Sequence, residues 1–234
     1  MKRSATRRAA PAAKKKRAPH SSARKATAIA ARKPGRARLD VSSRRLQLLA
    51  LGLAAFTEQA YDQVSIDEVA RAAGISKGLL YHYFPSKKEF YVATLRAAAA
   101  QLLDATAADP SLPPLERLSR GLEAFLAYVE QHARGYAALL RGGVGADPQV
   151  FEILESTRTR FQQRLLEGLP SELSSASLRL LSRGWVALVE TATLEWVEKR
   201  ELSRAQLQAL LAQSLLAILG AHAVVPVMAA KRKR

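Results

Sequence analysis

The run from Ser76 to Lys87, SKGLLYHYFPSK, has the chemistry needed to hold a polyanion. Lys77 and Lys87 supply cations, and the hydroxyl groups of Tyr81 and Tyr83 are natural hydrogen-bond donors to a phosphate beside them. The alternative is that both tyrosines are core aromatics of a helical protein. Helical phase puts neither ring at the centre of a core, so the sequence favours phosphate contact, more strongly for Tyr81.

Helical phase also predicts which side of this run meets a partner. At 100° per residue, Leu80 and Phe84 share one arc, while Gly78, Leu79 and His82 lie opposite. Gly78 removes bulk near the start of the helix, where a recognition helix approaches base edges in the major groove. The outer arc is therefore free to contact DNA.

Local signals place this helix after a tight turn. Ser65 to Ala73 is amphipathic, with a capping box formed by Ser65 and Glu68, and Gly74 suits the left-handed residue that ends a helix. Ser76 is an N-cap candidate for the next helix. Pro85 ends that helix, and the start of the following one, at Ser86, Lys87 and Lys88, suits a phosphate.

A first helix is expected over residues 40–62, where Leu46, Leu49, Leu53 and Phe56 recur at three- and four-residue steps. Arg44 and Arg45 stand in its first turn, where cations oppose the helix dipole. We therefore expect both arginines to face a polyanion.

These features together resemble the DNA-binding domain of the TetR family of bacterial transcriptional regulators. The resemblance covers residues 45–95 and rests on the following residues: Arg45, Leu48, Leu49, Phe56, Tyr61, Ser65, Val69, Ala70 and the run from Ala73 to Lys87. It implies phosphate contacts by Ser65, Tyr81 and Lys87. It also implies that Lys77, Gly78, Leu79 and His82 face bases.

Three residues depart from the family pattern. Gly52 stands where alanine is usual, and a glycine inside a helix costs up to about 1 kcal/mol. Ala60 stands where glycine is usual, and it would cost about 1–2 kcal/mol in a left-handed conformation. Leu79 replaces a threonine or serine, which leaves contact with a thymine methyl as its direct option.

The charge of the chain is unevenly distributed. The 234 residues carry a net charge of +17, but residues 1–38 hold 14 basic and no acidic residues, and the last four residues are all basic. Residues 39–230 hold 19 basic and 20 acidic residues. We expect a disordered basic tail (1–38), a DNA-binding domain (39–95), a helical ligand-binding and dimerisation domain (96–225) and a basic C-terminal tail (226–234).

The basic N-terminal tail is open to several interpretations. Its KKKR run could act in nuclear import, its composition resembles the tails of linker histones, and it could be a solvated or misassigned leader without a function. Sequence-independent contact with DNA phosphates is the interpretation that the charge favours.

Residues beyond 95 show only helical patterns. Helices are expected over 86–108, 114–132, 135–140 and 148–167, and the glycines between Gly142 and Gly145 lack the strand and the GK[ST] sequence of a phosphate-binding loop. A mostly apolar pocket between the middle helices is predicted from the following residues: Phe125, Tyr128, His132, Tyr136, Phe161, Trp185 and Glu190. Each of these residues could equally be ordinary core.

The last two predicted helices carry broad apolar stripes. The first stripe includes Leu178, Leu181, Trp185, Leu188, Ala192 and Trp196, and the second includes Leu207, Leu210, Leu211, Leu215 and Ile218. Such stripes are usually core, but two consecutive broad-faced helices also suit a four-helix dimer interface between residues 174 and 222. The resemblance implies the same interface.

Composition excludes several classes of protein. There is no cysteine, and the four histidines (His20, His82, His132 and His222) lie at no metal-ligand spacing. No apolar run is long enough to span a membrane, and no secretory signal is evident, so a cytoplasmic location is expected. No catalytic residues, metal or cofactor are predicted, and an enzyme is not expected.

The sequence therefore predicts an all-α, homodimeric, DNA-binding transcriptional regulator. We expect a repressor that binds a palindromic operator on double-stranded DNA and is released by a small-molecule effector. The alternative is a nucleoid-type architectural protein whose basic tails dominate binding. The effector, the operator sequence and the direction of regulation are not encoded in any motif of the chain.

Overall fold

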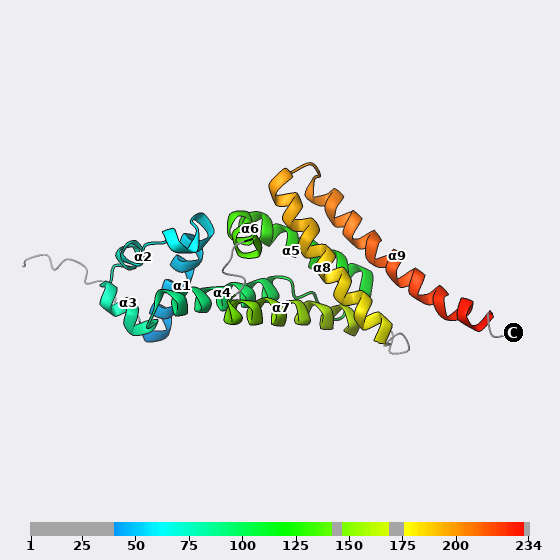
Figure 1. Cartoon of the computed structure of the whole chain (residues 1–234), viewed down its shortest axis with the longest axis horizontal. Coiled ribbons are helices and arrows are strands. Elements are labelled where there is room, and N and C mark those ends of the chain that lie inside the picture. Colours follow the sequence, from blue (N-terminus) through cyan, green and yellow to red (C-terminus); the bar gives the residue numbers. More distant parts are fainter. Residues whose placement is uncertain (1–39, 142–146, 169–175, 232–234) are drawn as a thin grey trace, which may run out of the picture. The chain divides into compact units, whose positions relative to one another are not determined.

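The computed structural model describes residues 40–141, 147–168 and 176–231, with side chains up to Gly220. These residues form helices without a strand, as predicted (Figure 1). In order they are α1 (Val41–Glu58), a 3-10 turn η1 (Tyr61–Gln63), α2 (Ile66–Ala73), α3 (Lys77–Tyr83), α4 (Lys87–Ala105), α5 (Pro114–Gln131), α6 (Ala133–Arg141), α7 (Pro148–Glu167), α8 (Ala176–Lys199) and α9 (Arg204–Lys231).

Helix α1 is shorter than expected. Asp40 caps its start, where a side-chain oxygen accepts from the Ser43 amide at 2.8 Å, but the helix ends at Glu58 and not at residue 62. The expected left-handed strain at Ala60 is also absent, because its φ of −60° is extended backbone that alanine adopts freely. The chain leaves α1 without a left-handed cap.

The buried face of α1 also differs from the predicted one. Leu46 is 67% exposed, whereas Leu48, Leu49 and Phe56 are buried together with Gly52. The apolar stripe thus begins two residues later than expected, and Leu46 lies on the solvent side of the first turn.

The helix-turn-helix forms as the local signals predict. Gly74 ends α2 in the left-handed conformation (φ 68°, ψ 35°), which glycine reaches without a Cβ penalty. The Oγ of Ser76 then accepts from the Leu79 amide at 3.1 Å, and the Oγ of Ser65 accepts from the Glu68 amide at 3.4 Å. Both serines are therefore engaged as N-caps.

A first hydrophobic core joins α1 to α4, and it extends beyond the expected DNA-binding domain. Phe56 and Phe84 both pack near Phe90 of α4, with ring centroids 5.7 and 5.0 Å apart. Val150 and Ile153, from the first two turns of α7, are buried in the same core. A helix of the C-terminal half thus contributes directly to the core that supports the helix-turn-helix.

The unusual Gly52 is explained by this core. A Cβ at residue 52 would lie 2.6 Å from Cζ of Phe90 and 2.7 Å from Oγ1 of Thr94, so these side chains would have to shift to admit it. Phe90 and Thr94 are themselves buried. The glycine therefore lets α4 approach α1 closely.

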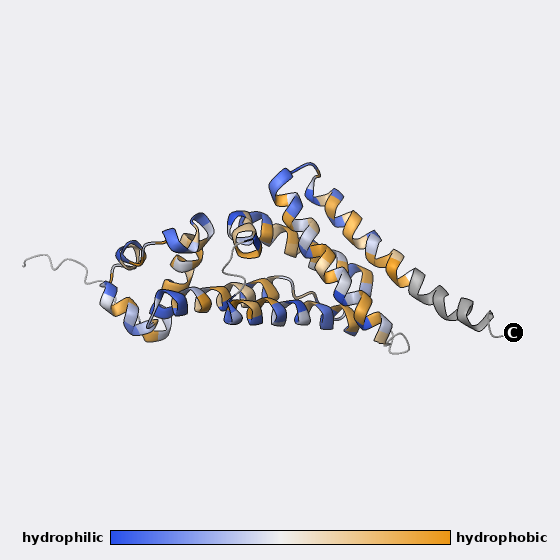
Figure 2. Ribbon diagram, viewed as in Figure 1, coloured by the Kyte–Doolittle hydropathy of each residue, from blue (hydrophilic) through white to orange (hydrophobic). Residues whose placement is uncertain are grey.

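A second core joins α5, α8 and α9. It contains Leu126, Val129, Trp185, Trp196 and Leu211, with the indole of Trp185 donating to the carbonyl of Leu211 and to the Oγ of Ser214. Three leucines of the predicted stripes are at the surface instead. Leu181, Leu188 and Leu210 are 36%, 42% and 53% exposed in the single chain, although both helices are rich in hydrophobic residues (Figure 2).

The domain boundaries stay predictions, and α4 runs unbroken across residue 95. Some sequence predictions fall outside the described residues. They concern the basic N-terminal tail with His20, the loop of Gly142 to Gly145, and the side chains of His222 and the C-terminal tail. Among the described helices, none combines the length and apolar character that a membrane span requires.

Candidate DNA-binding surface and ligand cavity

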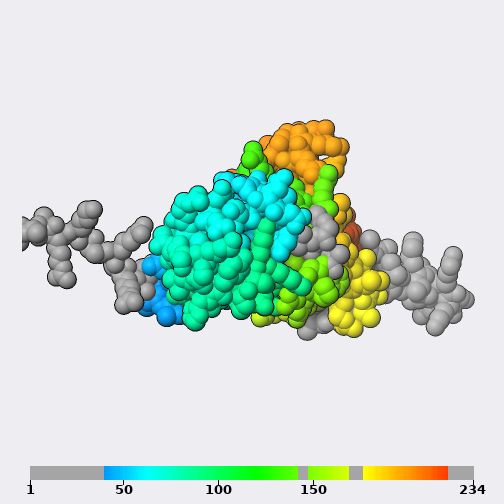
Figure 3. Space-filling view, turned by 60° about the vertical axis from the view of Figure 1, so that its left-hand side comes forward, coloured from blue at the N-terminus to red at the C-terminus, as the bar shows by residue number. Residues whose placement is uncertain are grey.

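Helix α3 presents the predicted outer arc to solvent. Leu80 and Phe84 are buried, whereas Gly78, His82 and Leu79, which is 40% exposed, lie on the surface. In the space-filling view, the region of α2 and α3, coloured cyan to teal, lies at the surface and is not covered by other helices (Figure 3). The surface that the sequence assigned to base contacts is therefore accessible, and the contacts themselves stay predictions.

The space at Gly78 supports this assignment. A Cβ built there would meet only the Oγ of Ser76, at 4.0 Å. The packing of the chain itself therefore does not require a glycine at this position. The missing side chain leaves room for a partner that approaches α3 closely.

Lys77 is not free in this structure. Its Nζ lies 2.8 Å from Oδ2 of Asp67, on the preceding helix, and both side chains are about half exposed. The hydrogen bond with Asp67 raises the pKa of Lys77. A contact between Lys77 and a base would require this ion pair to open, so Asp67 competes with DNA for the ammonium group.

Lys87, Tyr81 and Tyr83 lie beside the exposed face of α3. Nζ of Lys87 donates to the carbonyl of Asp62 at 3.1 Å and lies 5.0 Å from the ring centroid of Tyr61. Tyr81 and Tyr83 are half-buried and pack against the first core, so each ring is partly structural while its edge reaches the surface. The lysine is held beside the recognition helix by backbone and ring.

The two arginines of α1 have different surroundings. Arg44 is half-buried, and its guanidinium donates to the carbonyl of Ala73 at 3.2 Å and to the side chain of Gln47. It thereby satisfies a C-terminal carbonyl of α2, which is a structural function that the sequence did not suggest. Arg45 is exposed, with its guanidinium 5.0 Å from the ring centroid of Phe84.

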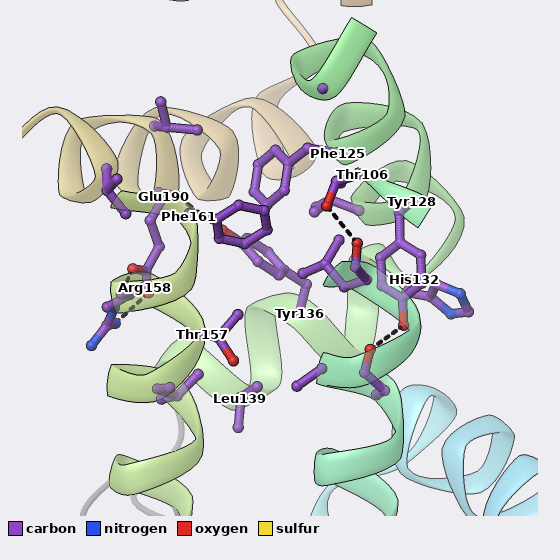
Figure 4. Close-up of a pocket in the computed structure, with 18 of the residues that line it drawn as sticks. Thr106, Phe125, Tyr128, His132, Tyr136, Leu139, Thr157, Arg158, Phe161 and Glu190 are labelled. Carbon is purple, nitrogen blue, oxygen red and sulfur yellow. Dashed lines mark hydrogen bonds and ion pairs between the residues drawn. The ribbon is translucent and has the colours of Figure 1, made fainter. Parts of the chain in front are cut away.

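A cavity of about 690 Å³ lies mainly between the helices of the C-terminal half, and its volume is within the range of pockets that hold drug-sized ligands. Its wall is built by residues of α1 and of α4 to α9 (Figure 4). All seven predicted pocket residues line it: Phe125, Tyr128, His132, Tyr136, Phe161, Trp185 and Glu190. The structure therefore brings the whole predicted set together, and ligand contact by each residue stays a prediction.

Aromatic rings form the centre of this wall. Phe125 packs edge-on against Phe161 and Tyr136, with ring centroids 5.9 and 6.4 Å apart. The rings of Tyr128 and His132 are 4.5 Å apart. Burial lowers the pKa of His132, which favours a neutral imidazole, and burial also raises the pKa of Tyr136 and of Tyr128.

An ion pair that the sequence did not predict closes one side of the cavity. Nε and Nη2 of Arg158 on α7 donate to the two carboxylate oxygens of Glu190 on α8, at 2.6 and 2.5 Å (Figure 4). The hydrogen bond with Glu190 raises the pKa of Arg158, and Glu155 supplies a further bond at 2.6 Å. Two elements of the wall are thus held together by charge-assisted bonds.

A periodic signal could have identified Arg158. Phe161 was a predicted pocket residue, and helical steps of three and four from it reach Thr157, Arg158, Arg164 and Leu165, all of which line the cavity. The pairing with Glu190 had no such signal, because the two residues are 32 positions apart on separate helices.

Polar groups in the wall are mostly satisfied by the protein. The Tyr128 hydroxyl donates to the carbonyl of Ala98 at 3.2 Å, and the Tyr136 hydroxyl donates to the carbonyl of Glu190 at 3.3 Å. Thr157 donates to the carbonyl of Ile153 at 2.7 Å. The described residues include no cluster of side chains able to hold a metal ion.

An all-helical chain with an exposed helix-turn-helix and a separate, mostly apolar cavity has the architecture of a ligand-controlled DNA-binding regulator. A family model described as bacterial regulatory proteins, tetR family, matches residues 48–94, and a second, described as Tetracyclin repressor-like, C-terminal domain, matches residues 114–218.

Three relatives illustrate the similarity. A solved tetR-family transcriptional regulator from Streptomyces coelicolor is 34% identical, with a TM-score of 0.74 over 80% of this chain and 85% of that chain. The HTH-type transcriptional activator FasR of Mycolicibacterium smegmatis is 27% identical over 68% of this chain and 75% of its own length. The HTH-type transcriptional repressor KstR2 of Mycobacterium tuberculosis is 36% identical, over 39% of this chain and 47% of its own length. The chain belongs to the TetR family of transcriptional regulators.

Proposed function

We propose that this regulator is a repressor that binds a palindromic operator as a homodimer and leaves it when a small molecule enters the cavity. The observation that carries the proposal is the shared use of α7. Val150 and Ile153 belong to the core that supports the helix-turn-helix, and all three of Thr157, Arg158 and Phe161 line the cavity. A ligand that displaces α7 would therefore act on both.

Helix α6 provides a second link between the cavity and α1. A Cβ at Gly135 would lie 2.9 Å from Oγ1 of Thr57 and 3.0 Å from its Cα, so α6 approaches the last turn of α1 closely. Tyr136, the next residue, lines the cavity. Because neither helix has spare room at this contact, a ligand that shifts α6 would also push on α1.

The homodimer is proposed to form through α8 and α9. Leu188 and Leu210 are exposed on these helices, and Leu188 lies in a surface groove with Gly184 and Ala187. Exposed leucines on consecutive long helices suit an isologous four-helix interface. Two half-site contacts would then act together on one operator.

Repression is our choice between two directions of regulation. Among the relatives, KstR2 is named a repressor and FasR an activator. We propose a repressor because a ligand-filled cavity that perturbs the supporting core most simply weakens DNA binding. The chain acts in the cytoplasm without a catalytic step in this proposal.

DNA footprinting with purified full-length protein tests the function. A discrete, symmetric protected site that a cavity ligand abolishes is the expected result. Protection that spreads along the DNA in proportion to protein concentration would instead support the architectural alternative.

The basic tail is proposed to add affinity without specificity. Each phosphate that it neutralises contributes about 0.9 to the slope of log affinity against log salt. Deletion of residues 1–38 should weaken binding to operator and random DNA together, and it should flatten this slope. Equal slopes for both proteins would show that the tail does not contribute.

A further inference from the structure

The cavity is long and narrow. Its lining follows α4 from Tyr91 to Thr106, fifteen residue steps that span about 22 Å at about 1.5 Å per residue. A volume of about 690 Å³ spread over that length gives a mean cross-section of about 31 Å². This section admits one extended chain or narrow molecule better than a compact, globular one.

Most polar groups in the middle of the cavity already have hydrogen-bond partners within the protein. The hydroxyl groups of Tyr128, Tyr136 and Thr157 all donate to backbone carbonyls, and Arg158 and Glu190 neutralise each other. A polar ligand group placed here would lose its hydration without gaining a free donor, so this part of the cavity selects an apolar chain.

The polar end of the cavity lies where α4 and α7 finish and α5 begins. Exposed residues there include Pro110, Leu115 and Glu167, so this end is open to solvent. Arg117 and Arg164 line the same end. Neither arginine forms an ion pair with a described residue, in contrast to Arg158 in the middle of the wall.

Arg164 is held in position by neutral groups. Its Nη1 donates to Oγ1 of Thr106 at 3.0 Å, and its guanidinium lies 6.0 Å from the ring centroid of Phe161. A guanidinium has five N–H donors, so this single bond leaves most of them available. Its charge is oriented but not neutralised by a described carboxylate.

Arg117 lies at the C-terminal end of α7. Its Nη2 would lie 3.3 Å from a Cβ at Gly168, so the guanidinium covers the C-terminal end of α7, where the helix dipole attracts a cation. Among the described residues that line this end, Glu167 is the one acidic side chain, against two arginines. The described lining of this end therefore carries an excess of one positive charge.

At the opposite end, at Gln59, Ala60 and Asp62, the described lining holds an acidic residue and no cation, and Lys87 lies beside it with its Nζ 3.1 Å from the Asp62 carbonyl. Among the described lining residues, the two arginines therefore stand at one end of the cavity and not at the other. We propose that the effector is an amphipathic anion, with an apolar chain in the cavity and a carboxylate or phosphate head bound by Arg164 and Arg117. This inference names the class of ligand for the proposed function and rests on that function.

The test uses full-length protein and four probes that share a dodecyl chain: dodecanoate, dodecyl phosphate, dodecan-1-ol and dodecyltrimethylammonium. Calorimetric titration below the micelle concentration should show tighter binding of at least one anion than of the alcohol or the cation, by about tenfold or more. A preference between the two anions identifies a carboxylate or a phosphate as the natural head group.

Variants assign the preference to the arginines. Arg164→Gln and Arg117→Gln should lower affinity for the preferred anion towards that of the alcohol, and Glu167→Gln should raise it. Arg160→Gln is the matched control, because Arg160 is exposed on the same helix and lies outside the lining. A thermal melt of each variant shows whether the protein is still folded, so that a lower affinity can be assigned to the lost charge. This control matters most for Arg117, because its guanidinium also covers the end of α7.

Three results would overturn the inference. They are equal affinity for the alcohol and the anions, unchanged anion binding in the folded Arg164→Gln protein, and no binding of any probe. The proposed function fails differently, namely if no compound of any charge class that occupies the cavity alters operator binding.

Discussion

Nζ of Lys88, in the first turn of α4, lies 2.6 Å from Oδ2 of Asp147, the N-cap residue of α7. The other side-chain oxygen of Asp147 accepts from the Gln149 amide at 2.9 Å. The hydrogen bond with Lys88 lowers the pKa of Asp147, so the carboxylate stays charged at neutral pH. One side chain therefore fixes the start of a cavity helix and ties it to the helix that follows the recognition helix.

The first prediction concerns this ion pair. Asp147→Asn should keep the cap, because asparagine is also a good N-cap, and remove the charge. We expect unchanged ligand affinity and a smaller effect of ligand on operator affinity, by up to about 1 kcal/mol or fivefold. Lys88→Gln should have the same effect, and the double variant should add nothing, as measured by operator titrations with and without ligand. Fully additive effects would show that the two residues act separately.

The second prediction tests the close approach at Gly52. Helix propensity alone predicts that Gly52→Ala stabilises the protein by up to about 1 kcal/mol. The clash with Phe90 and Thr94 opposes this gain, and overpacking typically costs about 1–3 kcal/mol. We expect a lower free energy of unfolding in a denaturant titration. Phe90→Leu, which shortens the side chain, should reduce the penalty of the alanine, and a more stable Gly52→Ala protein would refute the explanation.

The third prediction separates phosphate contacts from base contacts. Tyr81→Phe and Lys87→Ala should weaken binding to all DNA sites by similar factors, whereas His82→Ala and Lys77→Ala should relax preference at particular bases. Selection from a random pool of DNA fragments measures both effects. A changed consensus with Tyr81→Phe would contradict the assignment.

The fourth prediction follows from the pair of Lys77 and Asp67. Asp67→Asn frees the ammonium group, so operator affinity should rise if Lys77 contacts DNA. The same change in a Lys77→Ala background should have little effect, which controls for a general loss of negative charge. If Asp67→Asn raises operator affinity equally in both backgrounds, the gain comes from the loss of a negative charge near DNA and not from Lys77.

The fifth prediction concerns the dimer. Leu188→Glu should place a charge in the proposed interface and yield monomers, as measured by analytical ultracentrifugation. These monomers should bind a half-site poorly. Leu46→Glu is the matched control, because Leu46 is exposed on α1, away from α8 and α9. A Leu188→Glu protein that remains dimeric would place the interface elsewhere.

The sequence predicted those features that depend on residues close to one another along the chain. The turn at Gly74 and the caps at Ser65 and Ser76 follow from local conformational preferences, and they formed as expected. The buried arc of Leu80 and Phe84 follows from helical phase. The seven cavity residues were predicted from aromatic content on the middle helices, and they line one space.

Features that depend on distant residues could not be predicted. Arg44 stood in a first turn where a cation suggested a polyanion, but the carbonyl of Ala73 arrives from another helix. The exposure of Leu181 and Leu188 depends on how α8 packs against its neighbours, and helical phase alone does not determine this. The partner of Glu190 likewise depends on the approach of α7 and α8.

The contact at Gly52 also bears on how such regulators diverge. An alanine at position 52 fits this core without strain only when positions 90 and 94 both leave room, because both side chains occupy the space of the Cβ. The order of substitutions is therefore constrained: a lineage that enlarges residue 90 first needs glycine at 52 already in place. We expect positions 52 and 90 to change together among related sequences, with glycine at 52 wherever 90 is a bulky aromatic.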